Sequence, residues 1–472
     1  MNFLHQEFTI HPVGQGLFYS GKILYKNKVR FRMVVDCGSV TADACRQEVE
    51  IFRDSDFLKE KILDLLVISH FDKDHVSQIG NLLNGNIMVK KLVMPFLTFT
   101  ERLFLVLQYF SDQAYGPEDN FFLRFAIDPL TTIGENLDND SEIFLVEPDP
   151  NGPIDGDQII GEERSGSDND SEKRFEFNFK GKKIIESNES PISLNPKIRS
   201  YKVFDSERGI VSDITLNLME FIFYRRKTAI SESDLYDEIA ILFYQKFGID
   251  PKLPTQELHH AIIEKIKKIT SATEIKEIFL DAKKKIKFMR GVKPEDLNTT
   301  ALALLHRNLP DILKLGRNPY RNPEQWPLDM NSRVNTIHKF VASRVETPML
   351  THDHWAFRVR IREYPFTFPN VLLTSDGFLL NEKEIDPFLR HYKNYWNDFW
   401  LFQIPHHGSD RNSDGKLHSH LRSVHSCFIN YGIGNRDSHP SSNVIHHLIA
   451  TGNSSKIIPV NQIAGLRFEL TF

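Results

Sequence analysis

The chain has 472 residues, more than one compact domain usually contains, so we expect two or three units or one core with large insertions. Hydrophobic residues make up 40% and charged residues 26%, which is typical of a globular protein and excludes a wholly disordered chain. The formal net charge of −5 argues against a uniformly basic nucleic-acid-binding surface but leaves room for a local basic groove.

The cysteines and the N-terminal residues indicate the cellular compartment of the protein. Cys37, Cys45 and Cys427 form no C-x-x-C pair, so the sequence indicates neither a disulfide framework nor a thiolate zinc site. No basic segment followed by an apolar run opens the chain, and no run approaches 18 apolar residues. We therefore expect no signal peptide, no membrane span and a cytoplasmic protein.

Residues 1–110 are predicted to form the N-terminal half of an α/β core. Val29–Asp36 is a strong strand pattern, and the apolar run Leu63–Ser69 is typical of a buried strand. Helices are expected at Glu48–Leu63 and from Val76 to Leu83.

Residues 111–230 are predicted to extend this core. They include a mobile acidic loop at 147–174, rich in Pro, Gly, Asp and Ser, and a strand at Ile214–Arg225. Residues 231–345 are predicted to be a helical, locally basic insertion, because apolar residues recur at spacings of three and four. The helices expected there are Leu235–Phe247, Leu258–Ile269 and Ile275–Met289.

Residues 346–472 are predicted to form the C-terminal half of the core. Strand patterns return at Asn370–Ser375, Trp400–Ile404 and Cys427–Tyr431, and a helix is expected at Asn443–Ala450. The simplest organisation is one α/β core that the middle of the chain interrupts.

The stretch SHFDKDH at Ser69–His75 follows directly after a predicted buried strand. A strand end that opens into a turn can direct alternate side chains toward one point, and imidazole nitrogen and carboxylate oxygen suit zinc or manganese. The alternative is a solvated polar turn, since Asp and His are common where strands end. Four metal-ligand side chains fall within six residues: His70, Asp72, Asp74 and His75.

Three later turns carry further candidates. Asp376 leaves a buried strand in LLTSDG and is placed to bridge two ions, although Asp-Gly is also a common turn. His406 and His407 stand before Gly-Ser in PHHGS, and either could be a ligand. His439 in SHPSS could be a ligand, or could hold a substrate oxygen or leaving group. A single histidine is more often structural, so the hypothesis depends on all four clusters lying at strand ends.

With VGQG at 13–16 and VDCGS at 35–39, these stretches resemble the metallo-β-lactamase superfamily. Within it they are similar to the branch that includes the hydrolase domain of the DNA-uptake protein ComEC. The resemblance covers about 1–100 and 350–472, and HFDKDH and PHHGS are its most specific parts. It implies an αββα sandwich with the metals at one edge of two packed sheets, here split by a large, partly helical insertion.

The resemblance also implies a site with two divalent metal ions, Zn²⁺ or Mn²⁺. Asp36 would orient the metal-binding loop from behind, and His352 or His354 would add a contact. The family's usual middle histidine is Asp72 here, which makes manganese plausible beside zinc. The implied ligands are His70, Asp72, Asp74, His75, Asp376 and one of His406 and His407.

The reaction implied by the resemblance is hydrolysis of a phosphodiester, with DNA as the expected substrate. Asp74 would orient the attacking water and His439 would assist the leaving group. Two alternatives remain at this point: hydrolysis of a small ester, lactone or nucleotide messenger, and a partner-binding subunit of a defence or DNA-processing complex with a residual metal site.

The predicted insertion is a candidate surface for binding nucleic acid or another protein. Its basic side chains could hold a nucleic-acid backbone, or could form a solvated helix face paired with nearby glutamates. The helices could also bind a protein partner. The basic candidates are Lys267, Lys268, Lys284, Lys285, Lys287 and Arg290.

Overall fold

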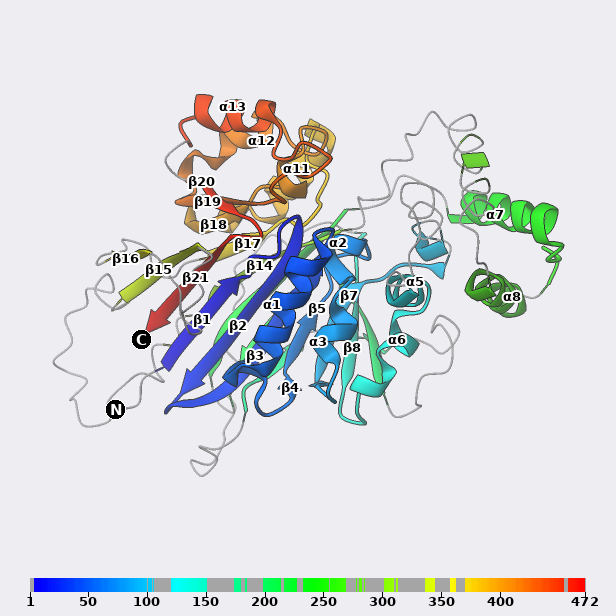
Figure 1. The fold of residues 1–472 in the computed structure, drawn as a ribbon, viewed down its shortest axis with the longest axis horizontal. Coiled ribbons are helices and arrows are strands. Elements are labelled where there is room, and N and C mark those ends of the chain that lie inside the picture. Colours follow the sequence, from blue (N-terminus) through cyan, green and yellow to red (C-terminus); the bar gives the residue numbers. More distant parts are fainter. Residues whose placement is uncertain are drawn as a thin grey trace.

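The fold is taken from a computed structural model of the chain. It describes residues 4–99, 101–103, 105, 120–150, 174–179, 183–184, 198–213, 216–226, 232–253, 255–268, 277, 280–281, 284, 301–309, 311–312, 336–343, 357–361, 370–453 and 457–471. The structure is mixed α/β, and its centre is a pair of large sheets (Figure 1).

The larger sheet has eleven strands in the order β10-β11-β8-β7-β5-β3-β2-β1-β21-β15-β16. From β11 to β3 the neighbours are parallel, and from β3 to β16 they are antiparallel. Its strands are β1 (Leu4–Ile10), β2 (Gly16–Tyr25), β3 (Lys28–Ser39), β5 (Leu65–Val67), β7 (Lys91–Pro95), β8 (Glu142–Glu147), β10 (Lys183–Ile184), β11 (Arg199–Phe204), β15 (Thr336–Ser343), β16 (Phe357–Ile361) and β21 (Ala464–Thr471).

The second sheet has eight strands in the order β20-β19-β18-β17-β14-β13-β12-β9. Its four strands from β20 to β17 are parallel, and the rest are antiparallel. A short pair, β4 (Ile62–Leu63) and β6 (Met88–Val89), stands apart from both. The strands of the second sheet are β9 (Glu176–Phe179), β12 (Arg208–Ser212), β13 (Asn217–Arg225), β14 (Leu302–Asn308), β17 (Asn370–Leu373), β18 (Phe399–Gln403), β19 (Ser426–Asn430) and β20 (Ile457–Val460).

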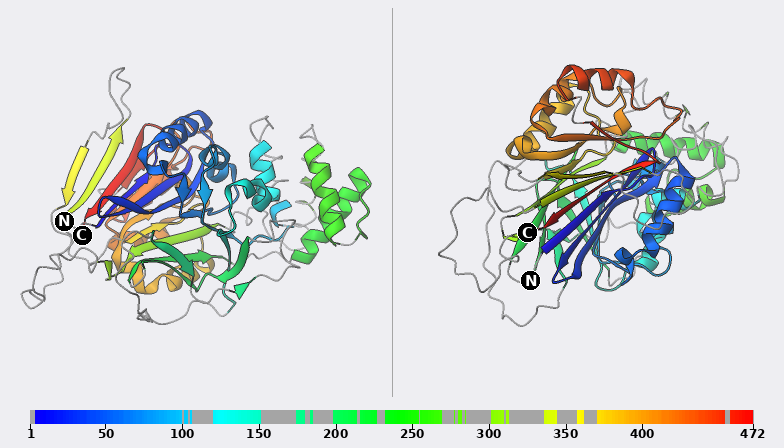
Figure 2. Two further views of the ribbon diagram at one scale, coloured as in Figure 1. Left: turned by 90° about the horizontal axis from the view of Figure 1, so that it is seen from below. Right: turned by 60° about the vertical axis from the view of Figure 1, so that its left-hand side comes forward.

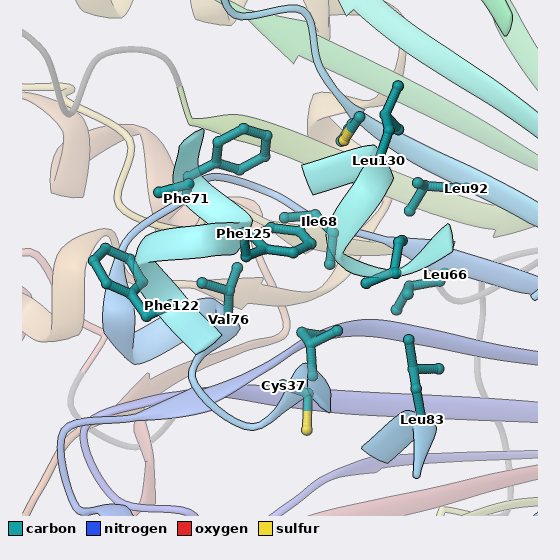
Figure 3. Close-up of a cluster of buried hydrophobic side chains, with 14 of the residues drawn as sticks. Cys37, Leu66, Ile68, Phe71, Val76, Leu83, Leu92, Phe122, Phe125 and Leu130 are labelled. Carbon is teal, nitrogen blue, oxygen red and sulfur yellow. The ribbon is translucent and has the colours of Figure 1, made fainter. Parts of the chain in front are cut away.

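The two sheets share one apolar core, and each has helices on its other face. Strand β5 and the residue after it show the arrangement, because Leu65 and Val67 join the core between the sheets while Leu66 and Ile68 join an outer core. That outer core lies under the helices of the larger sheet and includes Phe125 (Figure 3). The helices there are α1 (Ala42–Asp54), α2 (Lys73–Val76), α3 (Ile79–Leu83), α5 (Asn120–Ile127) and α6 (Pro129–Thr132).

The second sheet is covered on its far face by three helices of the C-terminal region (Figure 1). Buried residues of β18 and β19 pack there against apolar side chains of the helices. The layer order is therefore helix, sheet, sheet, helix. The three helices are α11 (Glu382–His391), α12 (Gly415–His420) and α13 (Ser442–Ala450).

The middle of the chain differs in part from its prediction. Two of the three expected helices are present as α7 (Glu232–Phe247) and α8 (Thr255–Lys268), at one end of the molecule (Figure 2). The third, predicted at Ile275–Met289, lies mostly outside the described residues. Strands β14 and β15, however, also fall inside the predicted insertion 231–345, and β14 pairs with both β13 and β17. A short apolar run such as Leu302–Asn308 fits a buried strand as well as a helix, so periodicity alone placed the end of the insertion too late.

Two boundaries near the N-terminus also differ. Helix α1 begins at Ala42, six residues before the predicted helix at Glu48–Leu63. The helix expected from Val76 instead begins at Lys73, inside the predicted ligand stretch, and breaks before α3. The acidic loop predicted at 147–174 lies mostly outside the described residues. Within the described part of the chain, no helix combines the length and the hydropathy needed to cross a bilayer.

His306 of β14 is expected to make the protein acid-sensitive. The ring is 2% exposed, its Nε2 lies 2.7 Å from the Tyr19 hydroxyl, and burial lowers its pKa from 6.5 to about 3. Between pH 6.5 and 3, His306 is protonated in the unfolded chain but stays neutral in the folded protein. The free energy of unfolding therefore falls as the pH drops from 6.5 toward 3. The loss is about 1.4 kcal/mol per pH unit.

Denaturant unfolding at pH 7 and pH 4.5 checks this expectation. His306→Gln keeps a hydrogen-bonding partner for Tyr19 but does not titrate in this range. The variant should lose clearly less stability than the wild type between the two pH values. Equal losses in both proteins would show that His306 does not carry this acid sensitivity.

Candidate metal centre

Four turns that are far apart in sequence meet at one edge of the two sheets. The first follows β5 and carries His70, and the second follows β17 and carries Asp376. The third follows β18 and carries His406 and His407. The fourth follows β19 and carries His439. Parallel strands bring their carboxyl ends to the same edge, which is why these turns converge.

Backbone hydrogen bonds tie the turns to one another. Leu302 N–H of β14 donates to the Ser69 carbonyl at 2.8 Å, which joins the first turn to the second sheet. His406 N–H donates to the Ser375 carbonyl at 3.0 Å. Ser375, His406 and His407 all have positive φ, so the backbone holds them in a conformation that non-glycine residues rarely adopt.

The centre of the site is a buried group of four residues. One ligand atom from each lies within 4.8 Å of the others, and all four side chains are buried or nearly so. The group draws on both sheets, since Asp376 follows a strand of the second sheet and the others follow β5 of the first. Its members are His70, Asp74, His75 and Asp376.

Asp376 lies between two sets of histidines, and each of its two carboxylate oxygens faces one set. Oδ1 is 3.3 Å from His75 Nε2 and 3.7 Å from His407 Nε2. Oδ2 is 3.5 Å from His70 Nε2 and 3.6 Å from His406 Nε2. Both PHHGS histidines therefore approach the carboxylate, from opposite sides.

The carboxylates of Asp72 and Asp74 each lie beside one of these two sets of histidines. Asp72 Oδ2 lies 3.8 Å from His70 Nε2, on the Oδ2 side of Asp376. Asp74 Oδ2 lies 2.9 Å from His407 Nε2, on the Oδ1 side. All seven candidate ligands thus come together in the structure, including both His406 and His407, of which the prediction required only one.

Asp36 orients the group from below. It is fully buried, and its carboxylate accepts hydrogen bonds from the N–H and the hydroxyl of Ser69, at 2.7 and 2.5 Å. It also lies 2.8 Å from His75 Nδ1. A carboxylate only accepts, so His75 Nδ1 carries the proton, and in the neutral ring Nε2 presents a lone pair to Asp376.

His70 and His407 are oriented in a comparable way. His70 Nδ1 lies 3.0 Å from the Ser69 hydroxyl and 3.1 Å from the Ser375 hydroxyl. His407 Nδ1 donates to the backbone carbonyl of Asn430 at 2.8 Å, which turns its Nε2 toward the carboxylates. Histidine ligands of metals usually donate their second ring nitrogen in this manner.

The electrostatics of the cluster favour a positive charge at its centre. Burial acts to lower the pKa of His75, but the charges of Asp376 and Asp74 outweigh it and raise that pKa well above its usual value. Burial likewise acts to raise the pKa of Asp376, but the positive charge of His406 and His75 holds it well below the usual range. The carboxylates therefore create a negative potential where the imidazoles point.

Three atoms at the centre of the cluster show that it can hold a cation. His70 Nε2, His75 Nε2 and Asp376 Oδ1 are buried and have no hydrogen-bond partner. An unpartnered buried polar atom costs about 1–3 kcal/mol. Divalent metal bound at these atoms would remove that cost. The residues present thus fit a divalent metal ion with nitrogen and oxygen ligands.

A cleft of about 810 Å³ opens over this cluster. Asp72, Asp74 and His406 form part of its lining and connect it to the buried group. Arg411 and Arg436, both exposed, contribute positive charge, while Val40, Leu105 and Phe122 contribute apolar surface. Four aspartates also line the cleft, Asp72, Asp74, Asp410 and Asp437, so the two arginines are positive points in a lining of mixed charge.

His439 lines the cleft beside His406, and their ring centroids are 5.8 Å apart. Asn435 holds it in place, because its side chain accepts from the His439 N–H at 2.9 Å and donates to the His439 carbonyl. Burial and the charge of His406 lower the pKa of His439 to about 4, so its ring is neutral near pH 7.

Two glycines allow the ligand turn to approach the first sheet. A Cβ at Gly38 would lie 2.6 Å from the His75 carbonyl carbon and from the Val76 nitrogen. A Cβ at Gly16 would lie 2.5 Å from the Asp74 carbonyl oxygen. Any side chain at either position would push the turn that carries Asp74 and His75 away from Asp376.

Most of the other predicted residues fall outside the described part of the chain. His352 and His354 lie outside the described residues, as do Lys285, Lys287 and Arg290. Lys267 and Lys268 lie in the last turn of α8, and only their backbone is described. Lys284 is exposed and its Nζ lies 3.4 Å from Asp281 Oδ1, which fits the alternative of a solvated helix face.

Several orienting residues escaped prediction. Ser69 and Ser375 position His70, and their hydroxyls lie 2.7 Å apart. Asn430 positions His407, and Gln403 accepts from the Ser375 N–H at 2.9 Å through its side chain. Gln403 and Asn430 each stand at the last residue of an apolar strand, where a buried polar side chain is a detectable signal.

In comparisons with known proteins, no protein-family model and no curated protein matches the chain.

Proposed function

We propose that this protein is a metal-dependent phosphodiesterase, acting as a nuclease on DNA, with a metallo-β-lactamase-type fold similar to that of the ComEC-like branch. The proposal depends most on one observation: His70 Nε2, His75 Nε2 and Asp376 Oδ1 face one another, buried and unpartnered. The helix–sheet–sheet–helix order and the cleft over the cluster support it.

The donor set supports two divalent ions, Zn²⁺ or Mn²⁺. One would be held by His70, Asp72 and His406 and the other by Asp74, His75 and His407, and Asp376 would help to hold them. When bound, such ions activate water and neutralise charge that develops on a phosphoryl oxygen.

The chain's own groups would then position the reactants. Asp74 lines the cleft with a carboxylate that is partly exposed, and it would hold the attacking water by a hydrogen bond. His439 is neutral near pH 7 and lies on the cleft wall, where it would hold the leaving oxygen. Arg411 and Arg436 would bind flanking phosphates.

Elemental analysis combined with nuclease assays tests the proposal. Wild-type protein loaded with zinc or manganese should contain metal and cleave DNA, and His70→Ala should contain less metal and lose cleavage. His420→Ala, which changes an exposed histidine of α12, is the control and should behave as the wild type. Loaded wild-type protein that leaves single- and double-stranded DNA intact would contradict the nuclease function. Cleavage of a cyclic dinucleotide by that protein would favour the small-substrate alternative.

Asp36→Asn is expected to weaken metal binding without removing a ligand. An amide has one accepting oxygen where the carboxylate serves the Ser69 N–H, the Ser69 hydroxyl and His75 Nδ1. Loss of such an orienting partner typically costs 10- to 100-fold in metal affinity, so we expect about that change. Competition titration with a fluorescent chelator measures it, and an unchanged affinity would show that Asp36 does not set the orientation of His75.

Arg411→Ala/Arg436→Ala is expected to weaken DNA binding in a salt-dependent way. Each phosphate contact contributes about 0.7–0.9 to the slope of log K against log salt, so the double variant should have a slope smaller by about 1.5. Lys383→Ala/Arg390→Ala removes the same charge from exposed positions on α11 that do not line the cleft. If both double variants change the slope equally, the cleft arginines are not phosphate contacts.

A further inference from the structure

A second group of unpartnered polar atoms lies in the outer helical layer, between α12 and α13. These helices pack against each other on the far face of the second sheet (Figure 1). His418 of α12 is fully buried and His447 of α13 is half-buried, and their ring centroids are 6.1 Å apart. Neither residue belongs to the centre described above.

The free atoms of these two rings are nitrogens. His418 Nδ1 and His447 Nδ1 are both buried without a hydrogen-bond partner. His418 Nε2 lies 3.3 Å from the Ser413 hydroxyl, which leaves Nδ1 as the nitrogen available to a ligand. Burial and the nearby His447 lower the pKa of His418 to about 4, so its ring stays neutral and can donate a lone pair near pH 7.

An unpartnered oxygen lies in the same region. Asn453 is fully buried, and its Nδ2 donates to the His418 carbonyl at 3.3 Å and to the Thr451 hydroxyl at 2.9 Å. Its Oδ1 has no partner. Asn453 follows α13 and its N–H donates to the Leu448 carbonyl, so it joins the two helices that carry the histidines.

Gly415 leaves room beside His447. A Cβ at this position would lie 3.5 Å from His447 Cγ and 3.6 Å from its Nδ1. Residues 415 and 418 are three apart in α12, so they share the face of the helix that meets His447. The absence of a side chain at 415 therefore keeps the space next to the unpartnered Nδ1 clear.

We propose that His418 and His447 bind a single transition-metal ion between α12 and α13, with the amide oxygen of Asn453 beside it. Two imidazole nitrogens and an oxygen suit zinc, cobalt, nickel or copper and do not suit magnesium or calcium. The ion would cross-link the helices. It would also brace two turns of the cleft, because α12 follows the turn with His406 and α13 follows the turn with His439.

Cobalt binding by the full-length, metal-stripped protein tests this site. We expect His447→Ala to bind one equivalent of Co²⁺ fewer than the wild type and to lose part of the cobalt-induced rise in melting temperature. His446→Ala, on the neighbouring exposed histidine, is the matched control and should bind as many equivalents as the wild type. These readouts do not depend on whether the protein cleaves DNA.

Equal cobalt content in the wild type and His447→Ala would overturn the proposal, and so would an equal loss in His446→Ala. If His447→Ala does not fold, anomalous scattering from cobalt-soaked wild-type crystals decides. A peak about 2.1 Å from both His418 Nδ1 and His447 Nδ1 is the expected result. No peak between α12 and α13 in crystals that bind cobalt elsewhere would overturn it.

Discussion

Asp376→Ala is expected to lose bound metal and to reduce phosphodiester hydrolysis by about 1000-fold or more. The carboxylate approaches four imidazole nitrogens within 3.3–3.7 Å, so it contacts both sets of side chains that flank it. Metal assistance contributes several kcal/mol to such reactions, and about 4 kcal/mol corresponds to a factor of 1000.

Asp410→Ala is a suitable comparison for this variant. Asp410 lines the same cleft and its carboxylate accepts from Asn443 Nδ2 at 3.0 Å, away from the histidines. Metal content by elemental analysis and steady-state cleavage rates should separate the two variants by at least two orders of magnitude. Wild-type cleavage by Asp376→Ala would remove this residue from the reaction.

Removing divalent metal is expected to destabilise the folded protein strongly. The bound ions would pair the buried lone pairs of His70, His75 and Asp376, and the unfolded chain does not form this arrangement. A ligand at 1000 times its dissociation constant stabilises the folded state by about 4 kcal/mol. Chelation should therefore lower the melting temperature by several degrees, and added zinc or manganese should restore it.

Two controls test whether this change in melting temperature comes from the buried cluster. Calcium, which prefers more oxygen ligands than the site offers, should restore little stability. His75→Ala removes a fully buried ligand and should reduce the response to chelator well below that of the wild type, even though its starting stability is lower. A melting temperature that chelator leaves unchanged in the wild type would mean that the buried cluster tolerates its lone pairs without an ion.

Much of the core was predicted from short apolar runs that end in polar turns. The continuous apolar run before His70 predicted a buried strand, and β5 confirms it. The strand–turn–helix succession after Asn370 also appears as predicted, in β17, β18, β19 and α13. The strands β17, β18 and β19 are short, buried on both faces and followed by polar turns, and these turns marked where each strand ends.

The middle of the chain was harder to predict, because pairing between distant strands leaves no local signal. β14 pairs with β13 and β17, 60 or more residues away in the chain, and its apolar run is equally compatible with a helix. The same limit applies to the site. His70 and Asp376 have recognisable local motifs, whereas Ser375 and Asn430 act only through residues that the fold brings to them.

The central claim is that the 70–75 turn and Asp376 hold divalent metal together, and anomalous X-ray scattering from crystals grown with zinc or manganese tests it most directly. We predict difference peaks between Asp376 and the Nε2 atoms of His70 and His75, at about 2.0–2.2 Å from each ligand atom. Crystals that show metal only at other places, with these nitrogens still unpartnered, would contradict the claim.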